Sequence, residues 1–371
     1  MEQNYRDLIA LAASAVNQTP LTREQIGAMD LDRVYEAAAY HQMTAVADCA
    51  LELAGVENPA FRRSRITEII KTESLDQERA AVARALTEAK IWFMPLKGIY
   101  MREYYPLRDM RQMVDNDILV DPSRREDVAR IMSELGFQQE NTGILYHDEF
   151  WKPPFCHFEM HWTLFNELSV PALYKYYANI REKLIGDGFE LRFSDEDFYV
   201  FMIAHNYKHY LSAGIGLRAL LDVYVYLQRF GDKLDWNYMH GEMKKMGFDA
   251  YERGQRSLAR KVFSPGAEPL SAQEVQKLEV YLRSGTHGTR EQLIGNAVER
   301  EGPLHYMKRR LIFDSMDQVK EFYPFFYRHR ILLPFLPLYR LIHSWKNVRS
   351  EVGSVVQLIR RGKKKPKSPG E

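Results

Sequence analysis

The chain has 371 residues, of which 46% are hydrophobic and 27% charged, and these values are typical of a folded globular protein. This composition excludes a wholly disordered or collagen-like chain, and the length predicts two or three domains. The longest unbroken apolar run, 331–339, contains two prolines and is far shorter than the roughly 20 apolar residues that cross a membrane. The two cysteines form no metal or redox motif, and the first residues do not resemble a secretory signal. The sequence therefore predicts a cytoplasmic protein with free thiols.

The charge is unevenly distributed, although the net charge is only +1. Residues 304–371 carry 15 Lys and Arg against 5 Asp and Glu, so the rest of the chain has a net charge of −9. Within this basic appendage, apolar residues recur at helical spacing over 341–359. We expect a helix that docks on the body or self-associates. Weak contact with an anionic membrane surface or a nucleic acid is the alternative, and a membrane contact would make the protein peripheral there.

The predicted elements follow in chain order. The first 90 residues indicate helices, and helices return from about residue 194 to about 297. Between them the patterns predict a strand at 91–96, a short helix at 99–105, a loop at 106–113, a strand at 114–120, a helix at 122–135 and a strand at 155–164. This order is typical of a compact α+β core flanked by helical regions. The predicted domains are a helical N-terminal region (1–75), a catalytic core (76–193), a helical domain covering the site (194–300) and the basic appendage (301–371).

Two aspartates lie two positions apart on the second predicted strand. Residues i and i+2 of a strand point to the same face, so Asp115 and Asp117 project together. Two neighbouring carboxylates repel each other unless a positive charge lies between them. A divalent cation is suitable, and oxygen ligands favour Mg²⁺. A solvated strand face is the simpler explanation for an isolated pair of this kind.

The third predicted strand alternates between an apolar face and a face that carries His157, Glu159 and His161. If this strand lies beside the Asp115 strand, three acids converge, as in a two-metal phosphoryl or nucleotidyl transfer site. The His-Glu-His row could instead hold zinc, but the spacing indicates no third nitrogen or sulfur ligand. Upstream, Lys97 and Gly98 end the first strand before a helix, a place suited to phosphate binding.

These residues together resemble a known family. The motifs are Leu96-Lys97-Gly98, Tyr105-Pro106, Arg111, Met113, Asp115-Asn116-Asp117, Glu159-Met160-His161-Trp162, His205-Asn206-Tyr207-Lys208-His209, Gly216-Leu217-Arg218 and Asp222. They are similar to an uncharacterised bacterial nucleotidyltransferase family of the polymerase-beta-type nucleotidyltransferase superfamily. The resemblance covers roughly residues 34–248 and implies a small mixed sheet with helices as the core.

The resemblance implies that Asp115, Asp117 and Glu159 are catalytic and hold two Mg²⁺ ions with a nucleoside triphosphate. It implies that an acceptor hydroxyl attacks the α-phosphorus and that pyrophosphate leaves, with Lys97 or Arg111 stabilising it. Two departures from the superfamily pattern are evident. Lys97-Gly98 replaces a glycine-serine pair, and Asn116 occupies an apolar-facing position that requires a hydrogen-bond partner.

The helix that begins near Asp197 continues an apolar stripe with His205, Lys208 and His209. If the helical half closes over the acids, these side chains contact nucleotide or acceptor. His161 is a candidate for proton transfer or for binding the acceptor. A hydrogen-bonded structural histidine pair is the alternative.

The leading hypothesis is thus a Mg²⁺-dependent nucleotidyltransferase with a nucleoside triphosphate as substrate and an unidentified hydroxyl acceptor. A catalytically inactive nucleotide-binding or interaction protein of the same fold is a second hypothesis. A regulatory or toxin-like enzyme that modifies RNA or protein is a third.

Overall fold

The computed structural model describes residues 1–141, 146–167, 169–285, 288–303, 305, 306, 316, 319 and 323–343. It divides into two compact units, Met1–Lys208 with Ile215–Thr286, and His209–Gly214 with His287–Glu371. The predicted domain limits remain predictions. Most of the predicted stripe at 341–359 lies outside the described residues.

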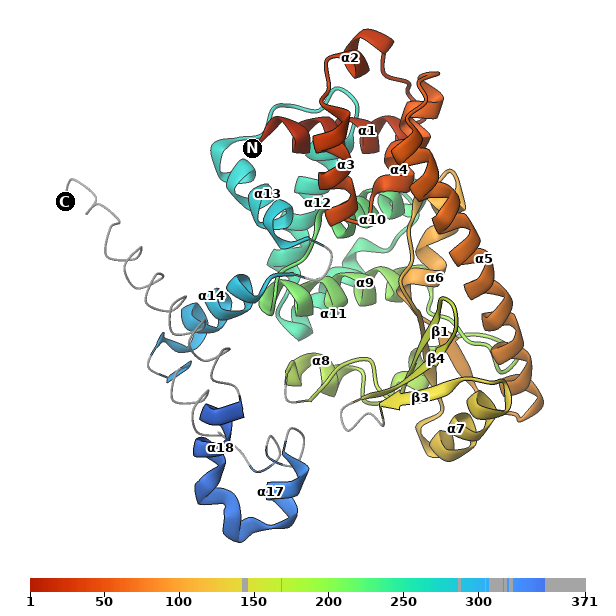
Figure 1. Cartoon of the computed structure of the whole chain (residues 1–371), viewed down its shortest axis with the longest axis vertical. Helices are drawn as coiled ribbons and strands as arrows, with labels where there is room; N and C mark the ends of the chain where they lie inside the picture. Colours follow the sequence, from red (N-terminus) through yellow and green to blue (C-terminus); the bar gives the residue numbers. More distant parts are fainter. Residues whose placement is uncertain are drawn as a thin grey trace, which may run out of the picture. The chain divides into compact units, whose positions relative to one another are not determined.

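The first unit is an α+β structure in which a sheet is flanked by helices (Figure 1). Its N-terminal helices are α1 (Gln3–Asn17), α2 (Arg23–Gly27), α3 (Leu31–Tyr40), α4 (Thr44–Leu53) and α5 (Pro59–Glu88). The later helices are α8 (Pro171–Tyr176), the short η3 (Ile180–Lys183), α9 (Asp195–Leu211), α10 (Leu217–Phe230), α11 (Trp236–Met246), α12 (Asp249–Phe263) and α13 (Ala272–Ser284). The first unit ends with the residues that follow α13, and the last three residues of α9 belong to the second unit.

The sheet has five strands in the order β1-β2-β5-β4-β3. The strands are β1 (Phe93–Pro95), β2 (Asn116–Val120), β3 (Gln138–Asn141), β4 (His147–Lys152) and β5 (Cys156–His161). Between them lie α6 (Lys97–Arg102), η1 (Arg108–Met110), η2 (Pro122–Arg124) and α7 (Arg125–Glu134). Only β2 and β5 pair in parallel, and the other three pairings are antiparallel. The sequence pattern predicts three strands and misses the hairpin of β3 and β4.

One face of the sheet is apolar and packs on α5 and α7. The alternating side chains Ile118, Val120, Phe158 and Met160 are fully buried there. Asn116 is on the same face and is also fully buried. The apolar core on this side fixes the strand registers, because a shift by one residue would turn every side chain to the opposite face.

The long helix α5 connects the N-terminal helices to this sheet. It begins with an Asn58 cap that accepts the N–H groups of Ala60 and Phe61, followed by Pro59 at the first helical position. Its first half packs on α4 and its second half on the sheet and α7, as Figure 1 shows on the right of the view.

The second unit contains α14 (Arg290–Glu301), α17 (Pro324–Arg328), η4 (Arg330–Phe335) and α18 (Leu336–His343). Among the described residues, no helix is both long and apolar enough to cross a membrane.

Candidate functional site

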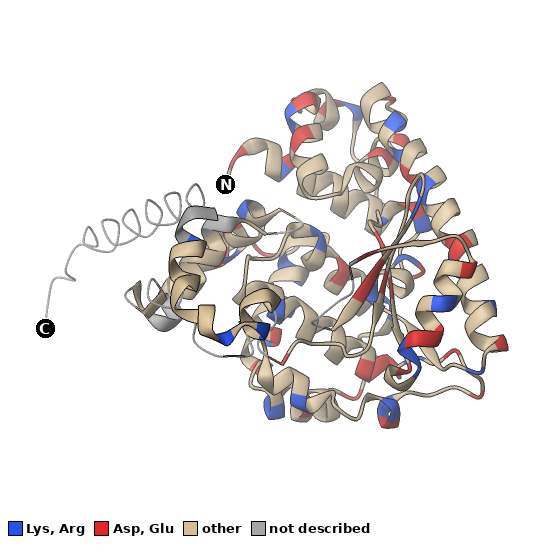
Figure 2. Ribbon diagram, turned by 60° about the horizontal axis from the view of Figure 1, so that its bottom comes forward, with Lys and Arg blue, Asp and Glu red and all other residues tan. Residues whose placement is uncertain are grey.

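The sheet face opposite the apolar core carries carboxylates on adjacent strands. The parallel register of β2 and β5 places Asp117 directly beside Glu159, and the antiparallel register of β4 and β5 places Glu149 on the other side of Glu159. Asp115 comes just before β2, on the face of Asp117 by strand alternation. Figure 2 shows acidic residues in red on the strands of the sheet. Carboxylates from three elements therefore converge on one face.

Imidazoles complete this face. His147 of β4 is the register partner of His161 of β5, and their ring centroids are 5.0 Å apart. The Nε2 atom of His161 lies 3.4 Å from Oε2 of Glu159 and 3.7 Å from Oδ1 of Asp117. The Nε2 atom of His147 lies 3.7 Å from the same Oε2 atom of Glu159. Acids and imidazoles are thus within ion-pairing distance.

The crowding of charges shifts the pKa values on this face. Burial, together with the charges of Asp117 and Glu159, raises the pKa of Asp115 to about 7. Burial opposes a charge on His161, but its contacts with Asp117 and Glu159 outweigh burial and raise the pKa of His161 to about 9. Burial likewise disfavours the Glu159 carboxylate, yet His161 holds the pKa of Glu159 below its ordinary value. The Asp115 carboxyl and the His161 imidazole thus both bind a proton more readily than they do in water.

Three groups of metal-ligating side chains have one ligand atom each within 4.8 Å of one another among the described residues. They are His147 with Glu159 and His161, Asp115 with His157 and Glu159, and Glu140 with Glu149 and His157. The buried Oδ1 atom of Asp117 also lacks a hydrogen-bond partner in the described part of the chain. A cluster of carboxylates and imidazoles in which a buried carboxylate oxygen has no hydrogen bond fits a divalent cation.

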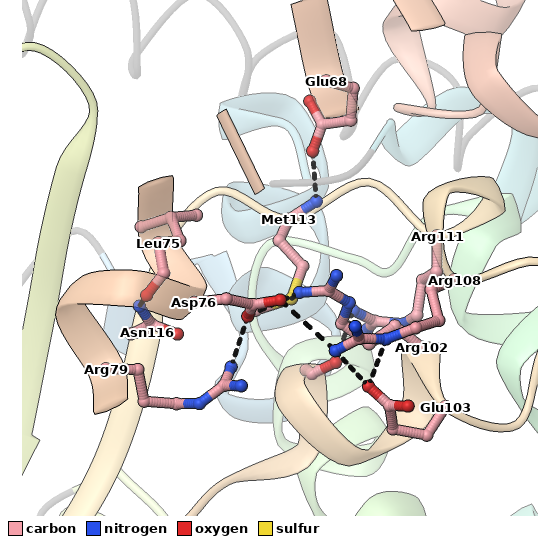
Figure 3. Close-up of polar contacts among 11 residues, drawn as sticks. Glu68, Leu75, Asp76, Arg79, Arg102, Glu103, Arg108, Arg111, Met113 and Asn116 are labelled. Atoms are coloured by element: carbon pink, nitrogen blue, oxygen red, sulfur yellow. Dashed lines mark hydrogen bonds and ion pairs between the residues drawn. The ribbon is translucent and has the colours of Figure 1, made fainter. Parts of the chain in front are cut away.

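The segment before β2, which carries Asp115, is held in place by α5. Glu68 accepts the backbone N–H of Met113 at 2.7 Å, and Lys71 donates to the Met113 carbonyl. Asn116 donates to the carbonyl of Leu75 at 3.1 Å (Figure 3), whereas its Oδ1 atom has no hydrogen-bond partner among the described residues. The backbone on both sides of Asp115 is therefore fixed to one helix.

The helix α6 is tied to α5 by a cluster of arginines around Asp76 (Figure 3). The buried Arg102 contacts Asp76 at 2.8 Å, and Arg79 and Arg108 contact the same carboxylate at 2.8 and 3.2 Å. Arg108 also pairs with Glu103. These contacts fix α6, whose first residues carry the predicted phosphate-binding pair.

Lys97 and Arg111 are both paired with a buried carboxylate. Arg111 donates to Asp222 through Nε at 2.9 Å and Nη2 at 3.0 Å, and through Nη1 to the Gly98 carbonyl at 3.2 Å. Lys97 donates to Asn206 at 2.8 Å and lies 3.7 Å from Asp222. Burial lowers the pKa of Lys97 to about 8, although Asp222 acts in the opposite direction. All three guanidinium nitrogens of Arg111 are used within the protein, which favours a positioning role for this residue.

The helical residues that were predicted to reach the site lie in different environments. Burial lowers the pKa of Lys208, whereas the charges of Asp117 and Glu159 favour its ammonium form, so this lysine is close to the acids. Its Nζ atom lies 5.8 Å from the ring centroid of Tyr146. His205 contacts the ring of Phe201, and His209 belongs to the second unit. Lys208 is the predicted helical residue that the structure brings near the carboxylates.

Sequence reasoning missed His147, because it missed the strand that carries it. The segment 138–152 contains few apolar residues, and its alternation becomes recognisable only from the pairing of β4 with β5. Glu68 and Lys71 gave no signal, because their contacts are to the backbone of a distant segment.

A mixed sheet with acids on two parallel strands is an arrangement expected of enzymes that transfer nucleotidyl groups. Residues 27–264 match the model of a family described as an uncharacterised nucleotidyltransferase. The match spans more than half of the chain, so the protein belongs to this family, whose general reaction class is nucleotidyl transfer. No curated protein and no solved structure matches the chain.

Proposed function

We propose that the protein transfers a nucleoside monophosphate from a nucleoside triphosphate to a hydroxyl acceptor, with Asp115, Asp117 and Glu159 holding two Mg²⁺ ions. The observation that carries this proposal is the pairing of Asp117 with Glu159 across β2 and β5, with Asp115 on the same face. The raised pKa of Asp115, which burial causes first and the charges of Asp117 and Glu159 increase, is consistent with it, because a bound cation would stabilise the carboxylate form.

Bound Mg²⁺ would neutralise the triphosphate charge and polarise the α-phosphorus. In the transfer, the acceptor oxygen forms a bond to the α-phosphorus while the bond from that phosphorus to the bridging oxygen breaks, and pyrophosphate leaves with the electron pair. Glu159 lies within 3.7 Å of two imidazoles and is suited to orient the acceptor or to receive its proton. Lys208 supplies a cation close to the acids that is suited to a phosphate oxygen.

The glycine at the start of α6 also supports the proposal. An added Cβ at Gly98 would meet Arg111 Nη1 and Met113 Cε at 3.5 Å, an ordinary contact distance, and the backbone there is not in the left-handed region. Packing within the protein therefore does not require a glycine. Close approach of a phosphate to the backbone provides a reason for one.

Binding and transfer can be tested separately. Titration calorimetry with each nucleoside triphosphate, with and without Mg²⁺, measures binding by the wild-type chain, by Asp117→Asn and by the control Asp249→Asn, which alters an exposed ion pair. Incubation with α-³²P-labelled triphosphates and cell extract then detects a labelled product and pyrophosphate. We expect Mg²⁺-dependent binding and labelling that Asp117→Asn abolishes and the control retains. Binding without labelling would favour an inactive nucleotide-binding protein, and no binding would refute the proposal.

A further inference from the structure

One group of ligands on the polar sheet face differs chemically from the aspartates. It combines two imidazoles, His147 and His161, with the carboxylate of Glu159. Mg²⁺ prefers oxygen ligands, whereas imidazole suits Mn²⁺, Fe²⁺, Co²⁺ and Zn²⁺. The three side chains come from the neighbouring strands β4 and β5, so the sheet holds them in fixed positions.

The distances between these ligand atoms are suitable for one ion. Oε2 of Glu159 lies 3.4 Å from Nε2 of His161 and 3.7 Å from Nε2 of His147. Ligand atoms that share an ion at about 2.1 Å are about 3.0–3.5 Å apart in tetrahedral or octahedral geometry. Small side-chain adjustments would therefore bring all three atoms to one ion.

An independent observation concerns His161. Its residue is only 7% exposed, its Nδ1 atom has no hydrogen-bond partner among the described residues, and its Nε2 atom faces the carboxylates of Asp117 and Glu159 at ion-pair distance. Once neutral, this imidazole is suited to a ligand that also satisfies the two carboxylates beside it. The ring lies between the carboxylates of Asp117 and Glu159, which makes that ligand a cation.

We propose that His147, Glu159 and His161 form a binding site for one transition-metal ion of the Mn²⁺ to Zn²⁺ series. The site is distinct in its ligands from the Asp115 and Asp117 site and shares Glu159 with it. The inference rests on the geometry and burial of these side chains and does not require that the protein transfers nucleotides.

The test uses full-length protein without a polyhistidine tag, treated with chelator and dialysed. Titration with Co²⁺, followed by its visible absorption, should show one ion per chain, and Zn²⁺ should displace it while millimolar Mg²⁺ should not. His147→Ala and His161→Ala should each raise the dissociation constant at least about 100-fold, because even changes in outer-shell partners cost 10–100-fold. His240→Asn is the matched control, since His240 lies 3.6 Å from Glu252 without a second imidazole in that pair. This variant should bind as wild type does.

Thermal unfolding of the metal-free variants checks that each is folded. If His161→Ala does not fold, His147→Ala alone tests the metal site. Undiminished Co²⁺ binding in folded His147→Ala would overturn the assignment, as would the absence of Co²⁺ and Zn²⁺ binding in the wild type. Loss of binding in His157→Ala with retention in His147→Ala would place the ion beside Asp115 and overturn it as well. Triphosphate binding with Mg²⁺ is measured in parallel, so that a failure of the nucleotidyl transfer proposal is recognised separately.

Discussion

Asp117 and Glu159 lie side by side on parallel strands, although 42 positions separate them in the sequence. Each strand is anchored by an apolar face that points away from the acids, so the protein can hold like charges together that would otherwise separate. The repulsion among these acids is offset by the folding energy of the core beneath them.

Removal of one acid should therefore stabilise the metal-free protein. We expect Asp115→Asn to raise the unfolding temperature by about 2–4 °C at pH 8 in the presence of chelator, because one of three repelling carboxylates is removed. Mg²⁺ should then cease to raise the unfolding temperature further, whereas it should do so in the wild type. Differential scanning calorimetry measures both effects. A lower unfolding temperature in metal-free Asp115→Asn would show that the protein itself compensates this charge.

Gly98→Ala should separate folding from ligand binding. The substitution places a methyl group at an ordinary contact distance in α6, so we expect unchanged or slightly higher stability, by up to about 1 kcal/mol. The added methyl group should nevertheless weaken Mg²⁺-triphosphate binding, measured by calorimetry, by at least tenfold. Gly254→Ala in α12, where an added Cβ meets nothing within 4 Å, is the control and should leave binding unchanged. Equal affinities for wild type and Gly98→Ala would exclude close phosphate approach at this glycine.

Asp222 should be important for stability, because it compensates two buried cations. We expect Asp222→Asn to lower the free energy of unfolding by about 3–5 kcal/mol, since Arg111 and Lys97 would lose their carboxylate. Asp249→Asn breaks an exposed pair with Arg253 and should cost less than about 1 kcal/mol. Urea unfolding gives both values. A loss below about 1 kcal/mol in Asp222→Asn would mean that the buried cations are not dependent on this charge.

His41 should contribute a loss of stability on mild acidification. Its Nδ1 atom accepts the N–H of Leu217, the first residue of α10, at 3.4 Å, so a proton there would remove this contact. Burial lowers the pKa of His41 to about 4, below the ordinary value of 6.5. The unfolded chain therefore binds the proton first, and stability is lost as the pH falls from about 6.5 to 4, by up to about 3 kcal/mol.

His41→Asn tests this contribution, because Asn supplies an acceptor that does not titrate. The free energy of unfolding of this variant should depend less on pH between 6.5 and 4.5 than that of the wild type. Parallel pH profiles of the two proteins would contradict the assignment.

The fold could be predicted from sequence where apolar residues mark an element. The strands at 91–96, 114–120 and 155–164 correspond to β1, β2 and β5, whose inward side chains are apolar. The strand β3 lies at the edge of the sheet and β4 lies between it and β5, and the side chains of both are largely polar, so no apolar period indicates them.

The same distinction applies to the candidate site. Strand alternation alone places Asp115 with Asp117, and Glu159 with its histidines, on shared faces. The sequence does not predict that β2 and β5 are neighbours, because the residues of a strand do not show which strand it pairs with. To place His147 at the site, one must know both the strand β4 and its register with β5, and the sequence pattern predicts neither. The contacts of Arg218 are likewise long-range, since it donates to Gln42 and to the Gln112 carbonyl.

The 30-residue helix α5 has a consequence for how this protein can be divided or transplanted. A fragment that begins at residue 76 would keep every strand but would lose Glu68 and Lys71, the two side chains that hold the backbone of Met113. The smallest fragment that keeps both the sheet and these contacts therefore begins at Pro59 or earlier. In recombination or in protein engineering, the helix and the acids that it positions must be inherited as one module.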